Sequence, residues 1–264
     1  MDFLDKIVSI KHEEVRLLTQ QRSFDEIKKQ CLLTHDQRNK ELRSLRNALL
    51  QSTPFGIIAE IKRASPSRGT LTDVSCEEIA YYYAQSKADA ISVLTDTTYF
   101  NGDISYLKTA KDIAPQPIFR KDFIIDEYQI YETALAHADA FLLIATLLDV
   151  SQLRSFISLS KELGLENIVE VHTEKEIEKA IEAGADIIGI NNRDFATMTI
   201  DIGTTERLMP YIPHNIIVIS ESGISSSHDV QRVVDAGVKG ILVGTSLIES
   251  KDPIRKIADL KAQI

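Results

Sequence analysis

From residue 56 onward, short apolar runs alternate with segments of helical periodicity, and this alternation limits the fold more than any other feature of the chain. The runs are rich in Ile, Val and Leu and are apolar on both faces, which is typical of a parallel sheet covered on both sides. Eight such runs occur, at residues 57–61, 91–94, 118–121, 141–145, 168–171, 187–191, 216–220 and 241–243. Successive runs begin 19 to 34 residues apart, a spacing that predicts eight strand–helix units.

The turns between these runs carry helix signals. Thr173 with Glu176 has the spacing of a capping box at a helix start. Gly184 and Gly237 each precede a strand and suit the left-handed conformation that ends many helices. His137 occupies the equivalent place in another unit, and because it is less suited to that conformation we expect its turn to close differently.

Residues 1–55 lack apolar runs of this kind and instead show helical patterns. Ser23 with Glu26 predicts a capping box that separates a first helix from a second. A third helix is predicted from the apolar stripe of Leu42, Leu45, Leu49 and Leu50. We therefore expect a single domain over residues 1–264, a (β/α)8 or TIM barrel in which residues 1–55 form a helical N-terminal extension. The alternative is a doubly wound open sheet, but its usual GxGxxG motif does not occur after the first run.

Composition excludes several classes of function. The 264 residues include 30 Lys and Arg against 39 Asp and Glu, and the resulting net charge of −9 gives no bulk attraction for nucleic acid or an anionic membrane. No apolar run approaches the length of a membrane span, and we expect no signal peptide. Cys31 and Cys76 form no CxxC pair, which favours a reducing compartment, the cytoplasm. The six histidines lack the spacing of metal ligands, so we expect neither a metal nor a cofactor.

Polar residues at the carboxyl ends of the predicted strands are the candidates for chemistry, because barrels of this kind carry their active sites there. Glu60 and Lys62 are two residues apart and therefore share one face of the first strand. Two buried charges there are costly unless they bind a substrate or pair with each other, so the alternative to a functional role is a structural ion pair. Lys121 ends the third run. Among other cations and apolar walls it would have a lowered pKa and serve as acid, base or Schiff-base former; the alternative is a solvated lysine.

Glu170 interrupts the fifth run between two valines. A buried carboxylate needs a partner, for which we expect Lys121 or Lys62. His172 shares the face of Glu170, and we expect it to support the site or to be solvated.

Asn191 and Arg193 also share a face, at the end of the sixth run, and a guanidinium suits a carboxylate or a phosphate. The alternative places Asn191 in a turn and pairs Arg193 with Asp194.

Glycine-containing turns follow the seventh and eighth runs, where many barrels hold a phosphate. They contain Ser222, Gly223, Gly244 and Thr245, and glycines let backbone N–H groups approach an anion. The alternative is a pair of ordinary turns. Together these residues predict acid–base chemistry on a small phosphorylated anion.

At these residues the chain resembles the indole-3-glycerol phosphate synthase family. The resemblance covers nearly the whole length and includes the motifs IAEIKRASPSRG, IFRKDFIIDEYQI, IVEVHT, IGINNRDF, ISESGI and ILVGTSL. It implies a carbon–carbon lyase of tryptophan biosynthesis. Such an enzyme cyclises and decarboxylates 1-(2-carboxyphenylamino)-1-deoxyribulose 5-phosphate, then dehydrates it to indole-3-glycerol phosphate without a cofactor or metal.

The resemblance also implies roles for individual residues. Lys121 matches the general acid of ring closure, Glu170 the general base of dehydration, and Lys62 the lysine that holds the substrate carboxylate. The supporting groups that orient these are Glu60, Asn191 and Ser222. The implied substrate contacts are Arg193 near the anionic substrate, Ser65, Gly223, Gly244 and Thr245 at the phosphate, and Phe100, Phe123 and Leu142 around the aromatic ring.

We expect a monomer that binds a small phosphorylated molecule, contacts neither nucleic acid nor membrane, and contacts other enzymes of the tryptophan pathway. We also expect the extension to cover part of the active-site mouth. The alternatives are another phosphate-binding barrel enzyme, such as a sugar-phosphate isomerase or a Schiff-base aldolase, and a non-catalytic phosphate-binding protein.

Overall fold

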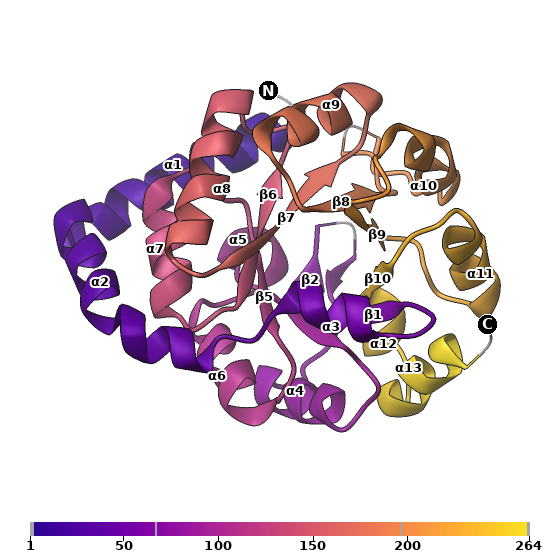
Figure 1. Cartoon of the computed structure of the whole chain (residues 1–264). Helices are drawn as coiled ribbons and strands as arrows, with labels where there is room; N and C mark the ends of the chain where they lie inside the picture. The colour runs from indigo at the N-terminus through magenta and orange to yellow at the C-terminus, as the bar shows by residue number, and fades with distance from the viewer. Residues whose placement is uncertain (1–2, 67, 196, 263–264) are drawn as a thin grey trace.

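The chain folds as a TIM barrel with a helical N-terminal segment, as predicted (Figure 1). The computed structural model describes residues 3–66, 68–195 and 197–262. Within them, eight parallel strands close in the order β1-β10-β9-β8-β7-β6-β5-β4. The strands are β1 (Gly56–Ile61), β4 (Ala90–Leu94), β5 (Ile118–Lys121), β6 (Ala140–Ile144), β7 (Glu166–Val171), β8 (Ile187–Asn191), β9 (Ile217–Glu221) and β10 (Gly240–Val243).

Helices surround the barrel and cover its outer face (Figure 1). They are α4 (Cys76–Ala84), α6 (Ser105–Ile113), α7 (Glu127–Leu135), α8 (Val150–Glu162), α9 (Glu174–Ala183), α10 (Gly203–Leu208), α11 (Ser227–Asp235) and α13 (Pro253–Lys261). Shorter elements lie in the loops: β2 (Ala64–Ser65), β3 (Gly69–Thr70), α5 (Thr97–Phe100), the 3-10 turn η1 (Met209–Tyr211) and α12 (Thr245–Ile248). None of the described helices has the length and hydropathy that a membrane span needs.

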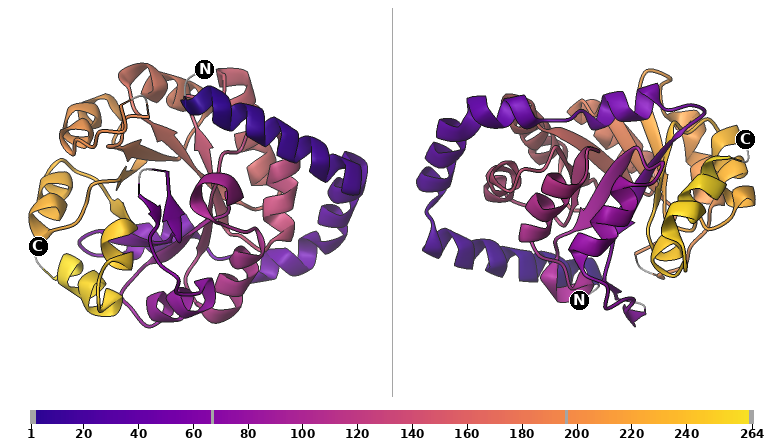
Figure 2. Two further views of the ribbon diagram at one scale, coloured as in Figure 1. Left: turned by 180° about the vertical axis from the view of Figure 1, so that it is seen from behind. Right: turned by 90° about the horizontal axis from the view of Figure 1, so that it is seen from below.

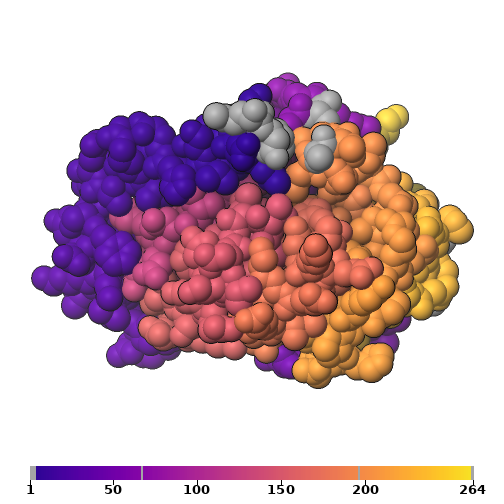
Figure 3. Space-filling model, turned by 90° about the horizontal axis from the view of Figure 1, so that it is seen from above, coloured from indigo at the N-terminus to yellow at the C-terminus, as the bar shows by residue number. Residues whose placement is uncertain are grey.

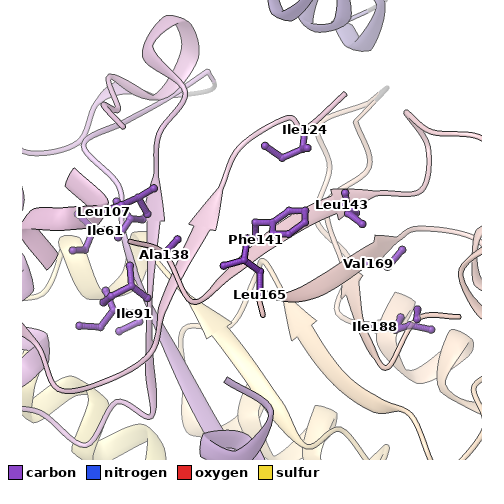
Figure 4. Packing of buried hydrophobic residues seen from close by; sticks show 14 of the residues in the cluster. Ile61, Ile91, Leu107, Ile124, Ala138, Phe141, Leu143, Leu165, Val169 and Ile188 are labelled. Carbon is purple, nitrogen blue, oxygen red and sulfur yellow. The ribbon is translucent and has the colours of Figure 1, made fainter. Parts of the chain in front are cut away.

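The strands alternate side chains between two buried layers, which explains why their sequences are apolar on both faces. Phe141, Leu143 and Val169 lie in the outer layer between strands and helices, and Figure 4 shows Val169 between Leu143 and Ile188. The inner layer fills the barrel with side chains such as Ile58, Phe119, Leu142 and Ile168. Burying each large apolar side chain contributes roughly 1.5–3 kcal/mol, so both layers stabilise the closed barrel.

The predicted strands are confirmed to within two residues, and one difference has consequences. The seventh run was expected to end at Ser220, but β9 continues to Glu221 because Glu221 pairs in register with Asn191 of β8. The alternation of the strand then directs Ser220 outward, where its hydroxyl bonds Asn192 and Thr205, and Glu221 into the barrel.

Two of the three predicted turn conformations are confirmed. Gly184 and Gly237 have φ of 91° and 104°, in the left-handed region. The prediction for His137 is wrong, since its φ of 63° is also left-handed. Histidine is among the few residues other than glycine that are enriched in this region, and the His137 ring lies 3.4 Å from Glu41 of the extension.

The extension wraps one side of the barrel from end to end. Its helices are α1 (Phe3–Gln21), α2 (Phe24–Glu41) and α3 (Leu45–Gln51). Figure 2 shows α1 and α3 at opposite ends of the barrel with α2 between them, and Figure 3 shows α1 and α2 packed along its side. The capping box of Ser23 and Glu26 is present.

The predicted apolar stripe of the third helix is only half correct. Leu45 and Leu49 are buried beneath the barrel, but Leu42 caps the end of α2 and Leu50 is 42% exposed. The helix is two turns long, so only its residues at spacing four face the strands.

Lys11 anchors α1 through buried ion pairs to the end of the barrel that lies opposite α3. Its ammonium lies 2.7 Å from Asp96 and 2.9 Å from Asp122, and all three side chains are at most 3% exposed. Asp122 also accepts from Thr95 and lies 3.0 Å from the Arg120 guanidinium. The two aspartates follow β4 and β5, so the extension is tied to two loops at the carboxyl ends of the strands.

Substituting Lys11→Met should lower the free energy of unfolding by about 3–5 kcal/mol, because two buried carboxylates lose their shared cation. Urea denaturation followed by circular dichroism measures the change. The matched control is Arg16→Met on the same helix, which removes an exposed pair with Glu13 and should leave the transition midpoint unchanged. Equal effects of the two substitutions would contradict the assignment.

Candidate active site

One cavity of about 320 Å³ opens at the carboxyl ends of the strands and is lined by the fourteen residues to which the sequence assigned a catalytic or substrate-binding role, whereas His172 lies behind them. They are Glu60, Lys62, Ser65, Phe100, Lys121, Phe123, Leu142, Glu170, Asn191, Arg193, Ser222, Gly223, Gly244 and Thr245. These residues are as much as 185 positions apart in sequence (245 − 60), and only the closed barrel brings them together.

The centre of the cavity is an ammonium shared between carboxylates. Lys121 Nζ lies 3.0 Å from Glu170 Oε2 and 2.8 Å from Glu221 Oε2. The three residues come from β5, β7 and β9, and each points inward by the alternation of its strand. Both glutamates are only 1% exposed, so water hardly screens these contacts.

Carboxylates around Lys121 overturn the prediction of a lowered pKa. Burial by itself lowers the pKa of the Lys121 ammonium, but the charges of Glu170, Glu221 and Glu60 outweigh burial and raise it well above its ordinary value. The prediction assumed cationic neighbours, whereas the nearest charges are negative. A raised pKa favours the ammonium form of Lys121 over the neutral amine.

The two glutamates beside Lys121 differ in their affinity for protons. Burial raises the pKa of Glu170, but Lys121 and His172 outweigh burial and hold that pKa below its usual range. Burial raises the pKa of Glu221 to about 7, and the neighbouring Glu170 carboxylate acts in the same sense. The site therefore holds one carboxylate that stays ionised at neutral pH and one carboxyl that titrates near neutral pH.

Glu60 and Lys62 pair with each other, at 2.8 Å. Of the two lysines proposed as partners of Glu170, Lys121 is confirmed and Lys62 is not. Both Glu60 and Lys62 line the cavity, so the pair is also within reach of a bound molecule.

Two glycines make room for the buried carboxylates. A Cβ on Gly244 would overlap the Glu60 carboxylate, and a Cβ on Gly189 would overlap the Glu221 carboxylate. Gly244 was singled out as a phosphate contact, and the structure gives it this additional reason to be glycine. Neither position therefore has room for a side chain while the carboxylate keeps its place.

Asn191 is both a residue of the cavity and part of a turn, the two interpretations that the sequence left open. Its side-chain oxygen accepts from the backbone N–H of Arg193 at 3.0 Å, as in a turn, and its side chain also helps to lower the pKa of Glu170. Arg193 lines the cavity, where its guanidinium donates to the Met198 carbonyl at 3.4 Å. Burial lowers the pKa of Arg193.

Glycine-containing turns line the other side of the cavity. Ser222 and Gly223 are consecutive left-handed residues with φ of 67° and 86°, and the Ser222 carbonyl accepts from the Asn192 amide at 3.0 Å. Gly244 and Thr245 begin α12. Ser65 lies on a hairpin of β2 and β3 that the sequence did not predict, since two-residue strands leave no periodicity to detect.

An apolar wall completes the cavity. The rings of Phe100 and Phe123 lie 6.3 Å apart, beside Leu142. Ile7 of α1 belongs to the same apolar cluster as Phe123 and Leu142. Among the described residues, the cavity lining begins at Glu60, so the extension supports this wall from outside rather than lining the mouth.

Glu221 is the main residue that sequence reasoning missed. It lies between Ser220 and Ser222 in a segment that was interpreted only as an anion-binding turn. The available signal was an isolated glutamate at a strand end, as at Glu170. Within the described part of the chain, no group of His, Cys, Asp and Glu has the arrangement of a metal site.

Comparison with known proteins identifies the family. The family model for indole-3-glycerol phosphate synthase matches residues 4–260. The chain belongs to the indole-3-glycerol phosphate synthase family. The synthase of Carboxydothermus hydrogenoformans is 43% identical over 266 residues, covering 98% of this chain and all of that protein. The synthase of Thermoanaerobacter pseudethanolicus is 47% identical over 212 residues, covering 80% of this chain and 81% of that protein.

Solved structures support the fold. A 3-hexulose-6-phosphate synthase from Salmonella typhimurium superposes with a TM-score of 0.64 at 18% identity, covering 79% of this chain and 98% of that one. A thiamine phosphate pyrophosphorylase from Pyrococcus furiosus gives a TM-score of 0.61 at 16% identity, covering 83% of this chain and 97% of that one. Family membership makes the chain an enzyme, a carbon–carbon lyase of tryptophan biosynthesis that acts on a small phosphorylated substrate.

Titration of Glu221 should be directly observable. In protein labelled with ¹³C at the glutamate carboxyls, NMR should resolve one group that titrates near pH 7, and Glu221→Gln should abolish that signal. If every glutamate titrated below about pH 5, the environment assigned to Glu221 would be wrong.

Gly189→Ala should lower kcat by about 100-fold, because the added methyl group displaces Glu221 and with it the Lys121 ammonium. Steady-state kinetics at saturating substrate measures kcat, and calorimetry verifies that the variant is folded. A folded variant with kcat within about twofold of wild type would show that the site tolerates this displacement.

Proposed function

We propose that the cavity binds 1-(2-carboxyphenylamino)-1-deoxyribulose 5-phosphate and converts it to indole-3-glycerol phosphate, CO2 and water. The observation that carries the proposal is the buried contact between Lys121 and Glu170, a proton donor and a proton acceptor in one cavity with an apolar wall and glycine turns. Ring closure, loss of CO2 and loss of water each need proton transfer or charge stabilisation within reach of such a pair.

Lys121 is the proposed acid of ring closure. The ketone oxygen gains negative charge as the aromatic ring attacks the carbonyl carbon, and it thereby becomes basic enough to take the Lys121 proton. A raised pKa keeps the lysine protonated until that charge develops. The same property disfavours a Schiff-base aldolase, which needs a neutral amine as nucleophile.

Glu170 is the proposed base of the dehydration step. Its lowered pKa keeps it ionised, and its position 3.0 Å from Lys121 lets both groups act on neighbouring atoms of one substrate. Asn191 and Ser222 border the same region and are proposed to orient substrate hydroxyls.

Lys62 is proposed to hold the substrate carboxylate. Its pairing with Glu60 has a physical benefit, since Glu60 competes with the substrate for the ammonium and prevents excessive stabilisation of the carboxylate that must leave as CO2. Binding the ground state more tightly would not accelerate decarboxylation.

The remaining residues are proposed to fix the two ends of the substrate. Arg193, with Ser65, Gly223, Gly244 and Thr245, offers the guanidinium, hydroxyl and backbone N–H groups that a phosphate requires. Phe100, Phe123 and Leu142 hold the aromatic ring, so that its reacting carbon meets the ketone.

We also propose that the enzyme acts as a monomer in the cytoplasm. Every group assigned to the proposed mechanism comes from this one chain, which favours a monomer. Both cysteines are free and buried, in agreement with a reducing compartment. Contacts with other enzymes of tryptophan biosynthesis remain a prediction from the family.

Lys121→Met should abolish turnover, because the proposed proton donor is lost. It should also lower the thermal transition, since two buried carboxylates lose their shared ammonium, so activity is compared at a temperature at which calorimetry shows the variant folded. Lys108→Met, which removes an exposed pair with Asp112, should leave turnover unchanged. Indole fluorescence follows product formation from the anilino-ribulose phosphate. Turnover by Lys121→Met, or borohydride trapping of substrate on Lys121 in the wild type, would overturn the proposed role.

A further inference from the structure

His172 lies between the proposed base and a second glutamate. Its Nε2 lies 3.5 Å from Glu170 Oε1, and its Nδ1 lies 3.3 Å from Glu176 Oε2. Neither ring nitrogen, nor Glu170 Oε1, has a hydrogen-bond partner within the described residues, so these ionic contacts are the polar surroundings of the ring. The His172 side chain is 12% exposed.

Glu176 is held in place by groups other than those the sequence suggested. A capping box would direct its carboxylate back to the Thr173 N–H, and that half of the motif is not formed. The carboxylate instead accepts from the His172 N–H at 2.6 Å and from the Thr146 hydroxyl at 2.8 Å. Phe195 packs against the imidazole with ring centroids 4.8 Å apart. The ring is therefore fixed by its backbone, by a carboxylate and by an aromatic neighbour.

We propose that His172, held by Glu176, is a positioning residue that keeps Glu170 oriented and ionised for its role as base. This inference rests on the proposed function, since it deepens the role of Glu170. One oxygen of Glu170 faces Lys121 and the other faces the imidazole, so the carboxylate is held from two sides. When Lys121 gives its proton to the substrate it becomes neutral, and His172 remains as the cation that favours ionised Glu170.

The charges around His172 favour a protonated imidazole. The charged groups facing it are Glu170 of β7, Glu176 of α9 and Glu221 of β9, with Lys121 of β5 on the far side of Glu170. Burial lowers the pKa of His172, but the three carboxylates outweigh burial and raise it. Removing the imidazolium therefore raises the pKa of Glu170, and the base form is then lost at a higher pH.

The test compares His172→Phe, which keeps a ring against Phe195 but removes both nitrogens, with His172→Gln, which restores a donor. The dependence of kcat on pH is measured from about pH 3.5 to 9, so that the range includes the titration of Glu170, whose pKa lies below the ordinary glutamate value in the wild type. For His172→Phe we expect the decline on the acid side to move up by roughly one pH unit, with kcat about tenfold lower on that limb and KM within about twofold of wild type.

Two further variants and a control complete the comparison. His172→Gln should recover part of kcat, and Glu176→Gln should move the decline in the same direction as His172→Phe. The matched control, Glu178→Gln on the exposed side of α9, should change nothing.

Three outcomes separate the possibilities. A lowered kcat in His172→Phe with an unmoved acid limb would overturn the inference, because a purely structural role changes the amount of competent enzyme and not the titration. An unchanged kcat would overturn it too. Glu170→Gln with wild-type turnover would instead overturn the proposed function, because Glu170 would not be the base. If His172→Phe does not fold, Glu176→Gln and His172→Gln provide the same comparison of pH profiles.

Discussion

The structure depends on one buried ammonium shared among carboxylates at the carboxyl end of the barrel. Lys121 contacts Glu170 and Glu221 directly, and the charge of Glu60 also acts on it. Burying so many charges is unfavourable unless they neutralise one another at close range. The barrel provides that arrangement because alternate residues of β1, β5, β7 and β9 point to one axis. The same arrangement separates the protonation states of the groups, which acid–base catalysis needs.

Much of the surrounding fold maintains this cluster. Gly189 and Gly244 leave space for two of the carboxylates. Lys11 ties the extension to Asp122, the residue after Lys121, and α3 closes the barrel from the other end. The extension thus supports the residue that follows the proposed acid and the apolar wall of the cavity, which explains how a segment outside the barrel can matter for the site.

The fold was predictable because its signals are local. Short runs that are apolar on both faces and the spacing of strand–helix units can both be recognised from neighbouring residues, and all eight barrel strands were located in this way. Candidate residues at strand ends were also predictable, since strand polarity places those ends at one rim. What could not be predicted is set by partners distant in sequence. The sign of the pKa shift of Lys121 depends on carboxylates from other strands, and Glu221 became part of the site only because pairing with Asn191 extends its strand by one residue. Likewise, the carboxylate of Glu176 bonds the His172 backbone instead of completing a local cap.

The most direct test of this account is the protonation state of Lys121 in the free enzyme. NMR of protein labelled at the lysine side chains can follow the Lys121 resonance as pH rises, with assignment by Lys121→Met. The account predicts that Lys121 remains protonated beyond the ordinary lysine pKa of about 10.4 and titrates at lower pH in Glu170→Gln. A wild-type resonance that titrates below about pH 9 would show a neutralised lysine and would contradict the carboxylate-stabilised acid on which the proposed mechanism depends.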